Sequence, residues 1–300
     1  MYKNFLKGMY YVPKNIDENP YSILKNANKS NLNFIIIEYT NKDLFTPCNY
    51  KKNISKLEYI RDKINSFEKK YKNTIGIICF KCRSIIGPIR ILLSKSIFQG
   101  EIFKLKNFHL WCYMNDPTLI LTHNNFSHIE NDNIKNYFSI MCDNFLKSTD
   151  NYVKFLNKGF RLTPIYTNDG FIFIKNSGEN IFEFSKIKNH IISQLKKGNF
   201  YISNSDKLYL NLTLNENSDK IKSSCNQVSK FKIKINNSDF TNHEIKIINN
   251  ENKIIKNQNL YNLKKILWEF EIKNNANKFI FLKITSKNNL FALTSPIYLS

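Results

Sequence analysis

The sequence predicts a mixed α/β protein in which an α/β unit is followed by a smaller all-β unit. Up to about residue 200, short apolar runs alternate with segments whose apolar residues recur every three or four positions. That pattern is typical of strands alternating with helices in a mainly parallel sheet or barrel. After Gly198 the apolar residues recur at every second position, so the change of period predicts domains at 1–200 and 201–300.

In the first unit, strands are expected where apolar runs are short and helices where apolar residues form a stripe. The runs with the composition of strands buried on both faces are 32–39 (LNFIIIEY), 74–79 (TIGIIC) and 118–122 (TLILT). The segments expected to be helical are 21–30, 54–71, 144–157 and 184–195. Gly198 then stands where a helix C-terminus is expected.

The second unit contains period-2 runs separated by clusters of Asn, Ser and Asp. These runs are 209–214, 231–235, 244–248, 267–272 and 279–284. Alternating runs with no good helix between most of them predict an antiparallel β-sandwich.

Composition excludes several classes of protein but does not indicate a function. Hydrophobic residues make up 42% and aromatic residues 14% of the 300 residues, which excludes a disordered or fibrous chain. The formal net charge is +21, but nearly all of the basic residues are lysine, and asparagine and isoleucine are abundant. Such a composition is what an AT-rich genome produces, so we discount the charge, although it favours weak association with polyanions.

The sequence also favours a cytoplasmic protein. No stretch approaches the roughly 20 apolar residues that a membrane helix needs. Residues 1–10 lack the apolar core and cleavage site of a signal peptide. The six cysteines are irregularly spaced, which indicates reduced thiols rather than a disulfide framework.

Four passages, in this order, resemble the PHP (polymerase and histidinol phosphatase) superfamily of metal-dependent phosphoesterases. They are 21–41 (YSILKNANKSNLNFIIIEYTN), 119–124 (LILTHN), 155–169 (FLNKGFRLTPIYTND), and 195–204 (LKKGNFYISN) together with 292–299 (ALTSPIYL). The similar branch is the one called CehA/McbA-like, in which a small β-sandwich follows the catalytic domain. The resemblance implies a distorted (β/α)7 barrel with metals at the carboxyl ends of its strands.

This sequence has few of the metal ligands that the resemblance implies. The Ala-His-Pro histidine matches His123, and the aspartate of the last Asp-x-His matches Asp169. The other ligand positions fall on residues that bind metals poorly or not at all: Tyr10, Val12, Tyr39, Thr40, Ile78, Pro88 and Phe171. Two ligands cannot hold a cluster of metal ions, because each ion needs several deprotonated donors that point toward it.

Each retained residue also has a simpler interpretation. His123 fits a histidine hydrogen-bonded at a strand end, and Asp169 fits the turn sequence Asn168-Asp169-Gly170. A metal site shared by His123 and His128 would lack a third ligand. The motif Cys79-Phe80-Lys81-Cys82 is a lone Cys-x-x-Cys, and two incidental cysteines explain it.

We therefore expect a degenerate PHP-type protein that lacks phosphoesterase activity and acts as a binding or structural module. No cofactor is expected; if one is bound, it is zinc, manganese or iron. One alternative is a hydrolase with a reduced metal site of His123, Asp169 and a third donor such as Glu38 or Asp43. The other is a basic protein that binds polyanions, although the sequence holds no nucleic-acid-binding motif. No partner is indicated.

Overall fold

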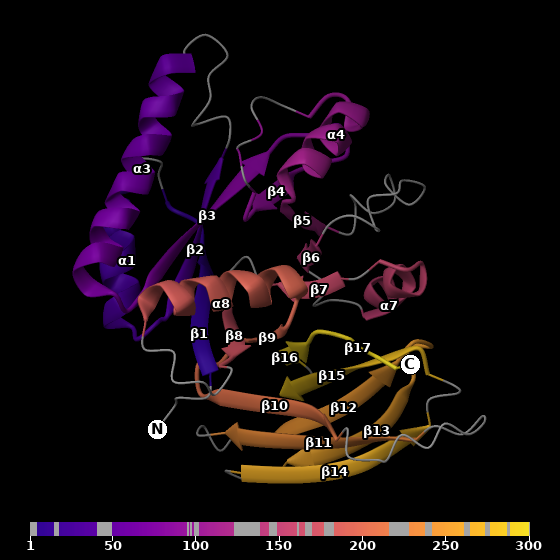
Figure 1. Cartoon of the computed structure of the whole chain (residues 1–300). Helices are drawn as coiled ribbons and strands as arrows, with labels where there is room; N and C mark the ends of the chain where they lie inside the picture. Colours follow the sequence, from indigo (N-terminus) through magenta and orange to yellow (C-terminus); the bar gives the residue numbers. More distant parts are fainter. Residues whose placement is uncertain are drawn as a thin grey trace.

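A long mixed sheet organises the molecule, and helices flank its N-terminal half (Figure 1). The computed structural model describes residues 5–14, 18–40, 50–94, 96, 98, 102–122, 139–143, 149–160, 162–165, 170–176, 183–215, 228–237, 242–260, 265–273, 277–286 and 289–299. The helices in these ranges are α1 (Pro20–Lys29), α3 (Tyr50–Tyr71), α4 (Leu105–Asn115), α7 (Thr149–Asn157) and α8 (Phe184–Lys197). The mixed α/β architecture predicted from the sequence is confirmed.

Eight of the described strands lie before residue 200 and nine from residue 200 onward. The earlier strands are β1 (Phe5–Tyr11), β2 (Phe34–Thr40), β3 (Ile75–Cys82), β4 (Ile89–Leu92), β5 (Thr118–Thr122), β6 (Ser139–Asp143), β7 (Leu162–Ile165) and β8 (Phe171–Lys175). The later strands are β9 (Phe200–Ser203), β10 (Leu208–Asn215), β11 (Val228–Asn237), β12 (His243–Asn249), β13 (Ile254–Leu260), β14 (Lys265–Lys273), β15 (Phe279–Ser286), β16 (Asn289–Thr294) and β17 (Ile297–Tyr298).

One sheet joins both halves of the chain. Its order among the described strands is β13-β12-β15-β16-β9-β8-β1-β2-β3-β4-β5-β6-β7, with β17 paired to β15. The strands β1, β2 and β3 are parallel, as are β5, β6 and β7, but β4 runs antiparallel to both of its neighbours. The reversal at β4 is a departure from the simple strand-helix alternation expected from the sequence, because a short segment after β3 turns back directly.

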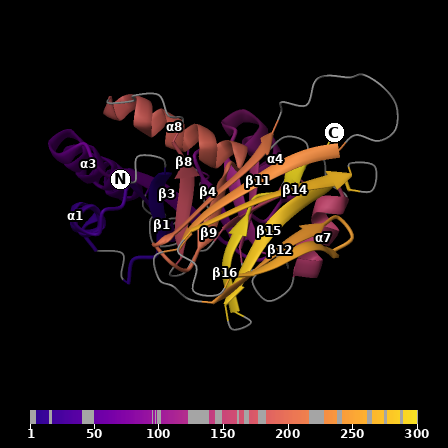
Figure 2. The same cartoon turned by 90° about the horizontal axis from the view of Figure 1, so that it is seen from below.

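A second sheet, β10-β11-β14, packs against the antiparallel end of the first one (Figure 2). The shared core takes Phe231, Ile233 and Ile235 from β11 and Ile245 and Ile247 from β12. These residues occupy alternate positions, so the period-2 pattern of the sequence corresponds to the buried face of each strand.

The helices that the sequence predicts have the expected buried stripes and ends. On α3 the buried residues include Leu57, Ile60, Ile64 and Phe67, at steps of three and four. Helix α8 ends at Gly198, whose φ of +70° is left-handed and suits glycine. The predicted helix at 144–157 is found as α7 from residue 149 onward, and residues 144–148 lie outside the described ranges.

Helix α4 was not expected, and its packing explains why. Its buried residues are Phe108 and Cys112, whereas Leu110, Tyr113 and Met114 are exposed. Apolar residues therefore occur around much of the helix and form no single stripe for the sequence pattern to reveal. In the described part of the chain, no helix is both long enough and apolar enough to cross a membrane.

Candidate functional site

The strand pairings place the sequence-predicted ligand positions on two faces of the sheet. Tyr10 pairs with Ile36, which shares its face with Glu38 and Thr40 because alternate residues of a strand point the same way. Tyr39 and Ile78 lie on the opposite face. These degenerate positions therefore do not converge on one point.

The other predicted site residues lie elsewhere. Phe171 pairs with Met9, so it is on the face opposite Tyr10. Val12 follows the end of β1 and is 44% exposed, and Pro88 precedes β4 and is exposed. The candidate ligands are outside the described residues: His123, Asp169, His128 and Asp43.

A buried polar cluster, formed by Tyr10, Glu38, Cys79, Lys81 and Arg90, occupies the face that Tyr10 shares with Glu38. The Glu38 side chain is 4% exposed, and its Oε2 accepts hydrogen bonds from the Tyr10 hydroxyl and from Arg90 Nε, both at 2.6 Å. Lys81 Nζ lies 3.8 Å from Oε1 of the same carboxylate. Strands β1, β3 and β4 thus direct side chains at the one carboxyl group on β2.

Strand register explains this convergence. Glu38 pairs with Cys79 across β2 and β3, and Lys81 pairs with Arg90 across β3 and β4. Residues paired across strands place their side chains on the same face. A carboxylate in an otherwise apolar strand is costly to bury unless it is paired, and Arg90, whose side chain is 12% exposed, supplies the countercharge.

The hydroxyl of Tyr10 links the carboxylate to a thiol. It donates a hydrogen bond to Glu38 Oε2 at 2.6 Å and lies 3.3 Å from the Cys79 sulfur. Burial raises the pKa of Tyr10 well above its ordinary value, and the neighbouring Cys79 and Glu38 raise it further. Burial likewise raises the pKa of the Cys79 thiol. Both groups are held in their neutral forms and are not activated nucleophiles.

The described residues of this cluster do not suit a metal ion. Among them, no group of three or more His, Cys, Asp or Glu side chains is positioned as a ligand set. Oε2 of Glu38 already accepts two hydrogen bonds, and the Arg90 guanidinium stands where a cation would have to approach. A metal ion would add to the two positive charges, Arg90 and Lys81, that already lie at this carboxylate, and it would be repelled by both.

The motif from Cys79 to Cys82 lies along β3. Both cysteines are buried and neither forms a disulfide, and residues three apart on a strand point to opposite faces. A reactive pair would need an exposed thiol of lowered pKa, and burial at Cys79 has the opposite effect.

Glu38 was expected from the sequence only as a possible metal donor, and Arg90 was not expected as its partner. A usable signal was present: a single acid within the apolar run 34–39 must find a countercharge if both faces of the strand are buried. Which basic residue fulfils this need depends on strand pairing, which the sequence does not display.

Comparison with known proteins gives a limited result. No protein-family model matches the chain, and no curated protein matches it. Among solved structures, it is similar to a two-domain protein from Bacteroides vulgatus described as containing a predicted PHP-like metal-dependent phosphoesterase. That similarity has a TM-score of 0.45 and 10% identity, and covers 98% of this chain and 95% of the other. A structural genomics consortium target is similar over 31% of this chain and 84% of its own length, with 10% identity and a TM-score of 0.19.

Proposed function

We propose that the chain is a divergent PHP-type protein of the CehA/McbA-like kind that lacks phosphoesterase activity and acts as a binding or structural module. The observation that carries the proposal is the bonding of Glu38, whose carboxylate is already neutralised by Arg90 at 2.6 Å. A metallohydrolase needs its carboxylates free to bind the ions that acidify the attacking water. Here a fixed guanidinium takes the place of such an ion.

The same contacts argue against a reduced metal site that includes Glu38. Recruiting Glu38 as a ligand would require Arg90 and Tyr10 to withdraw from it, which would leave a buried guanidinium and a buried hydroxyl without their acceptor. Removing one partner of a buried charge pair costs about 3–5 kcal/mol. A metal site would have to recover that cost before it bound anything.

We further propose that residues 1–200 form a distorted (β/α)7 barrel and residues 201–300 a β-sandwich. The parallel strands β1 to β3 and β5 to β7 support the first unit, and the core between the two packed sheets supports the second. The units would be joined rather than separate, since β9 pairs with both β8 and β16. A cytoplasmic location is proposed because Cys79, Cys82 and Cys112 are not joined in disulfides.

The test measures metal content and phosphoesterase activity together. The purified chain is analysed for zinc, manganese and iron, and is then assayed on a phosphomonoester with each metal added. We expect substoichiometric metal and no turnover above the background. Stoichiometric metal with turnover that disappears in both His123→Ala and Asp169→Asn would overturn the proposal, because it would show a working site outside the described residues.

A further inference from the structure

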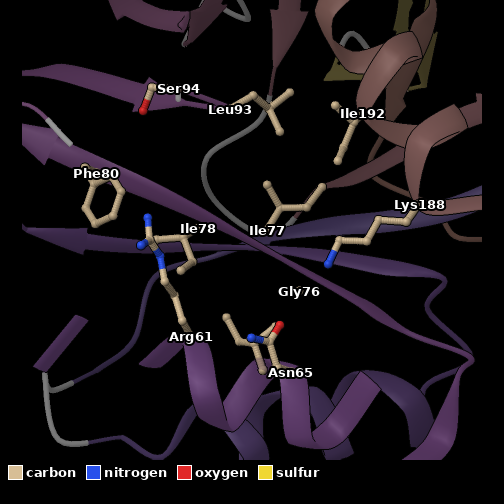
Figure 3. A pocket seen from close by; sticks show the side chains of 11 residues that line it. Arg61, Asn65, Gly76, Ile77, Ile78, Phe80, Leu93, Ser94, Lys188 and Ile192 are labelled. Carbon is tan, nitrogen blue, oxygen red and sulfur yellow. The ribbon is translucent and has the colours of Figure 1, made fainter. Parts of the chain in front are cut away.

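A pocket of about 300 Å³ lies between α3 and α8, away from the buried polar cluster (Figure 3). Its floor is the first half of β3, at Gly76 to Ile78, whereas β4 pairs with β3 only from Cys79 onward. Figure 3 shows Arg61 and Asn65 rising from α3 and Lys188 reaching in from α8.

A buried carboxylate holds the three walls of this pocket together. Glu68 of α3 accepts a hydrogen bond from the backbone amide of Gly76 at 3.0 Å and one from Lys188 Nζ at 2.7 Å. A Cβ at Gly76 would lie 2.8 Å from Ile64, so the helix packs directly against the strand here. The pocket is therefore a defined feature of the packing among α3, β3 and α8.

Among the described residues at the pocket, one positive group has no ion-pair partner. Glu68 forms an ion pair with Lys188, so these two charges largely cancel. Arg61 also lines the pocket, and none of the described acidic side chains forms an ion pair with it. A guanidinium binds a carboxylate through two parallel hydrogen bonds, which makes a single carboxylate the matching ligand group.

Apolar side chains line the rest of the pocket together with the polar Asn65 and Ser94. Ile78, Phe80, Leu93 and Ile192 line the pocket beside Arg61. Apolar walls with a few placed polar groups are typical of small-molecule sites, and the volume is at the lower end of their range. At roughly 30 Å³ per water-sized group, the pocket holds on the order of ten non-hydrogen atoms.

We propose that this pocket binds a small monocarboxylate with an apolar body of about seven carbons. Arg61 binds the carboxylate at the mouth, and the apolar body lies against Ile78, Phe80 and Ile192. The proposal rests on the binding role proposed above and names the class of ligand. Straight-chain and aromatic acids share this chemistry, so the experiment below compares one acid of each kind.

Isothermal titration calorimetry of the full chain with octanoate, which has ten non-hydrogen atoms, tests the proposal. Octanamide has the same size without the charge, acetate lacks the apolar body, and 3-phenylpropanoate separates aromatic from straight-chain acids. We expect one-to-one binding of octanoate or 3-phenylpropanoate, and at least tenfold weaker binding of octanamide and acetate.

Two variants locate the site, and a third is the matched control. Arg61→Gln removes the cation and Ile192→Trp fills the pocket, so each should weaken binding at least tenfold. Lys70→Gln removes one positive charge from the opposite side of α3 and should leave binding unchanged. Circular dichroism of each variant verifies folding.

The result that overturns the proposal is absent binding of both acids, equal binding of octanamide, or equal affinity in wild-type and Arg61→Gln. Several weak sites that respond equally to Lys70→Gln would also overturn it, since they would reflect the overall positive charge. The two proposals can fail separately. Absent octanoate binding would not change the metal and turnover measurements, and a phosphoesterase activity would not change octanoate binding.

Discussion

Replacing Arg90 with methionine removes the cation next to Glu38 and keeps an unbranched side chain that reaches in the same direction. The Glu38 side chain is 4% exposed and that of Arg90 is 12% exposed, so little water can replace the lost charge. Breaking a buried pair in this way costs about 3–5 kcal/mol. Lys81 at 3.8 Å compensates in part, so we expect a loss of about 3 kcal/mol in the free energy of unfolding.

A double variant separates the cost of the orphaned charge from the cost of lost packing. In Glu38→Gln with Arg90→Met, no buried charge remains, and the amide oxygen of the new side chain still accepts the Tyr10 hydroxyl. Replacing both members of a buried pair is often nearly neutral. We expect the double variant to be within about 1 kcal/mol of the wild type and well above Arg90→Met.

Urea and thermal unfolding, followed by circular dichroism, measure these differences. A loss of about 3 kcal/mol corresponds to a fall in Tm of roughly 6–12 °C by the scaling for domains of 150–250 residues. The control is Lys232→Met, which removes an ion pair with Glu269 on an exposed strand face and should cost under about 1 kcal/mol. The reasoning is refuted if Arg90→Met matches this control, or if the double variant is no more stable than Arg90→Met.

Three further predictions concern the core. A Cβ at Gly8 would collide with the fully buried ring of Phe34, so Gly8→Ala should cost about 1–3 kcal/mol in thermal unfolding, and unchanged stability would contradict the packing described. The buried hydroxyl of Tyr201 bonds a backbone carbonyl and a backbone amide of β10, each at 3.0 Å, so Tyr201→Phe should cost about 1–3 kcal/mol in urea unfolding, more than an exposed Tyr59→Phe control. Burial raises the pKa of the Cys79 thiol, so this thiol ionises at a lower pH in the unfolded chain than in the folded one. Its contribution to the free energy of unfolding is therefore complete below about pH 8.5 and is lost as the pH rises. The decline in Tm between pH 8 and 10 should therefore be smaller in Cys79→Ala, and an identical decline would count against the buried thiol.

Much of the local structure could be predicted from residue periodicity. The stripe on α3 and the alternating strands β11 and β12 repeat their pattern of burial within a few residues, so the sequence displays it directly. Helix α4 could not be predicted in this way, because it leaves Leu110, Tyr113 and Met114 exposed while burying Phe108. Strand β4 was missed because four residues are too few to establish a period.

In the candidate sites, too, the sequence predicts the position of a side chain on its own element but not its partner. The strand β2 carries Glu38 within an apolar run, so its sequence already requires a countercharge. Likewise, α3 places Arg61 and Asn65 one turn apart on the same side of the helix, which follows from helix geometry alone. Neither segment indicates what lies opposite it.

The sequence by itself therefore determined the elements with a clear periodicity, such as α3, β11 and β12, and that an acid would be buried in β2. Only the tertiary structure decided that Arg90 neutralises Glu38 and that Lys188 faces α3 across a pocket. The physical reason is that the position of a side chain along its own element follows from local geometry, whereas its partner depends on the register of strands and the packing of helices. Those arrangements bring together residues 52 and 120 positions apart in the chain.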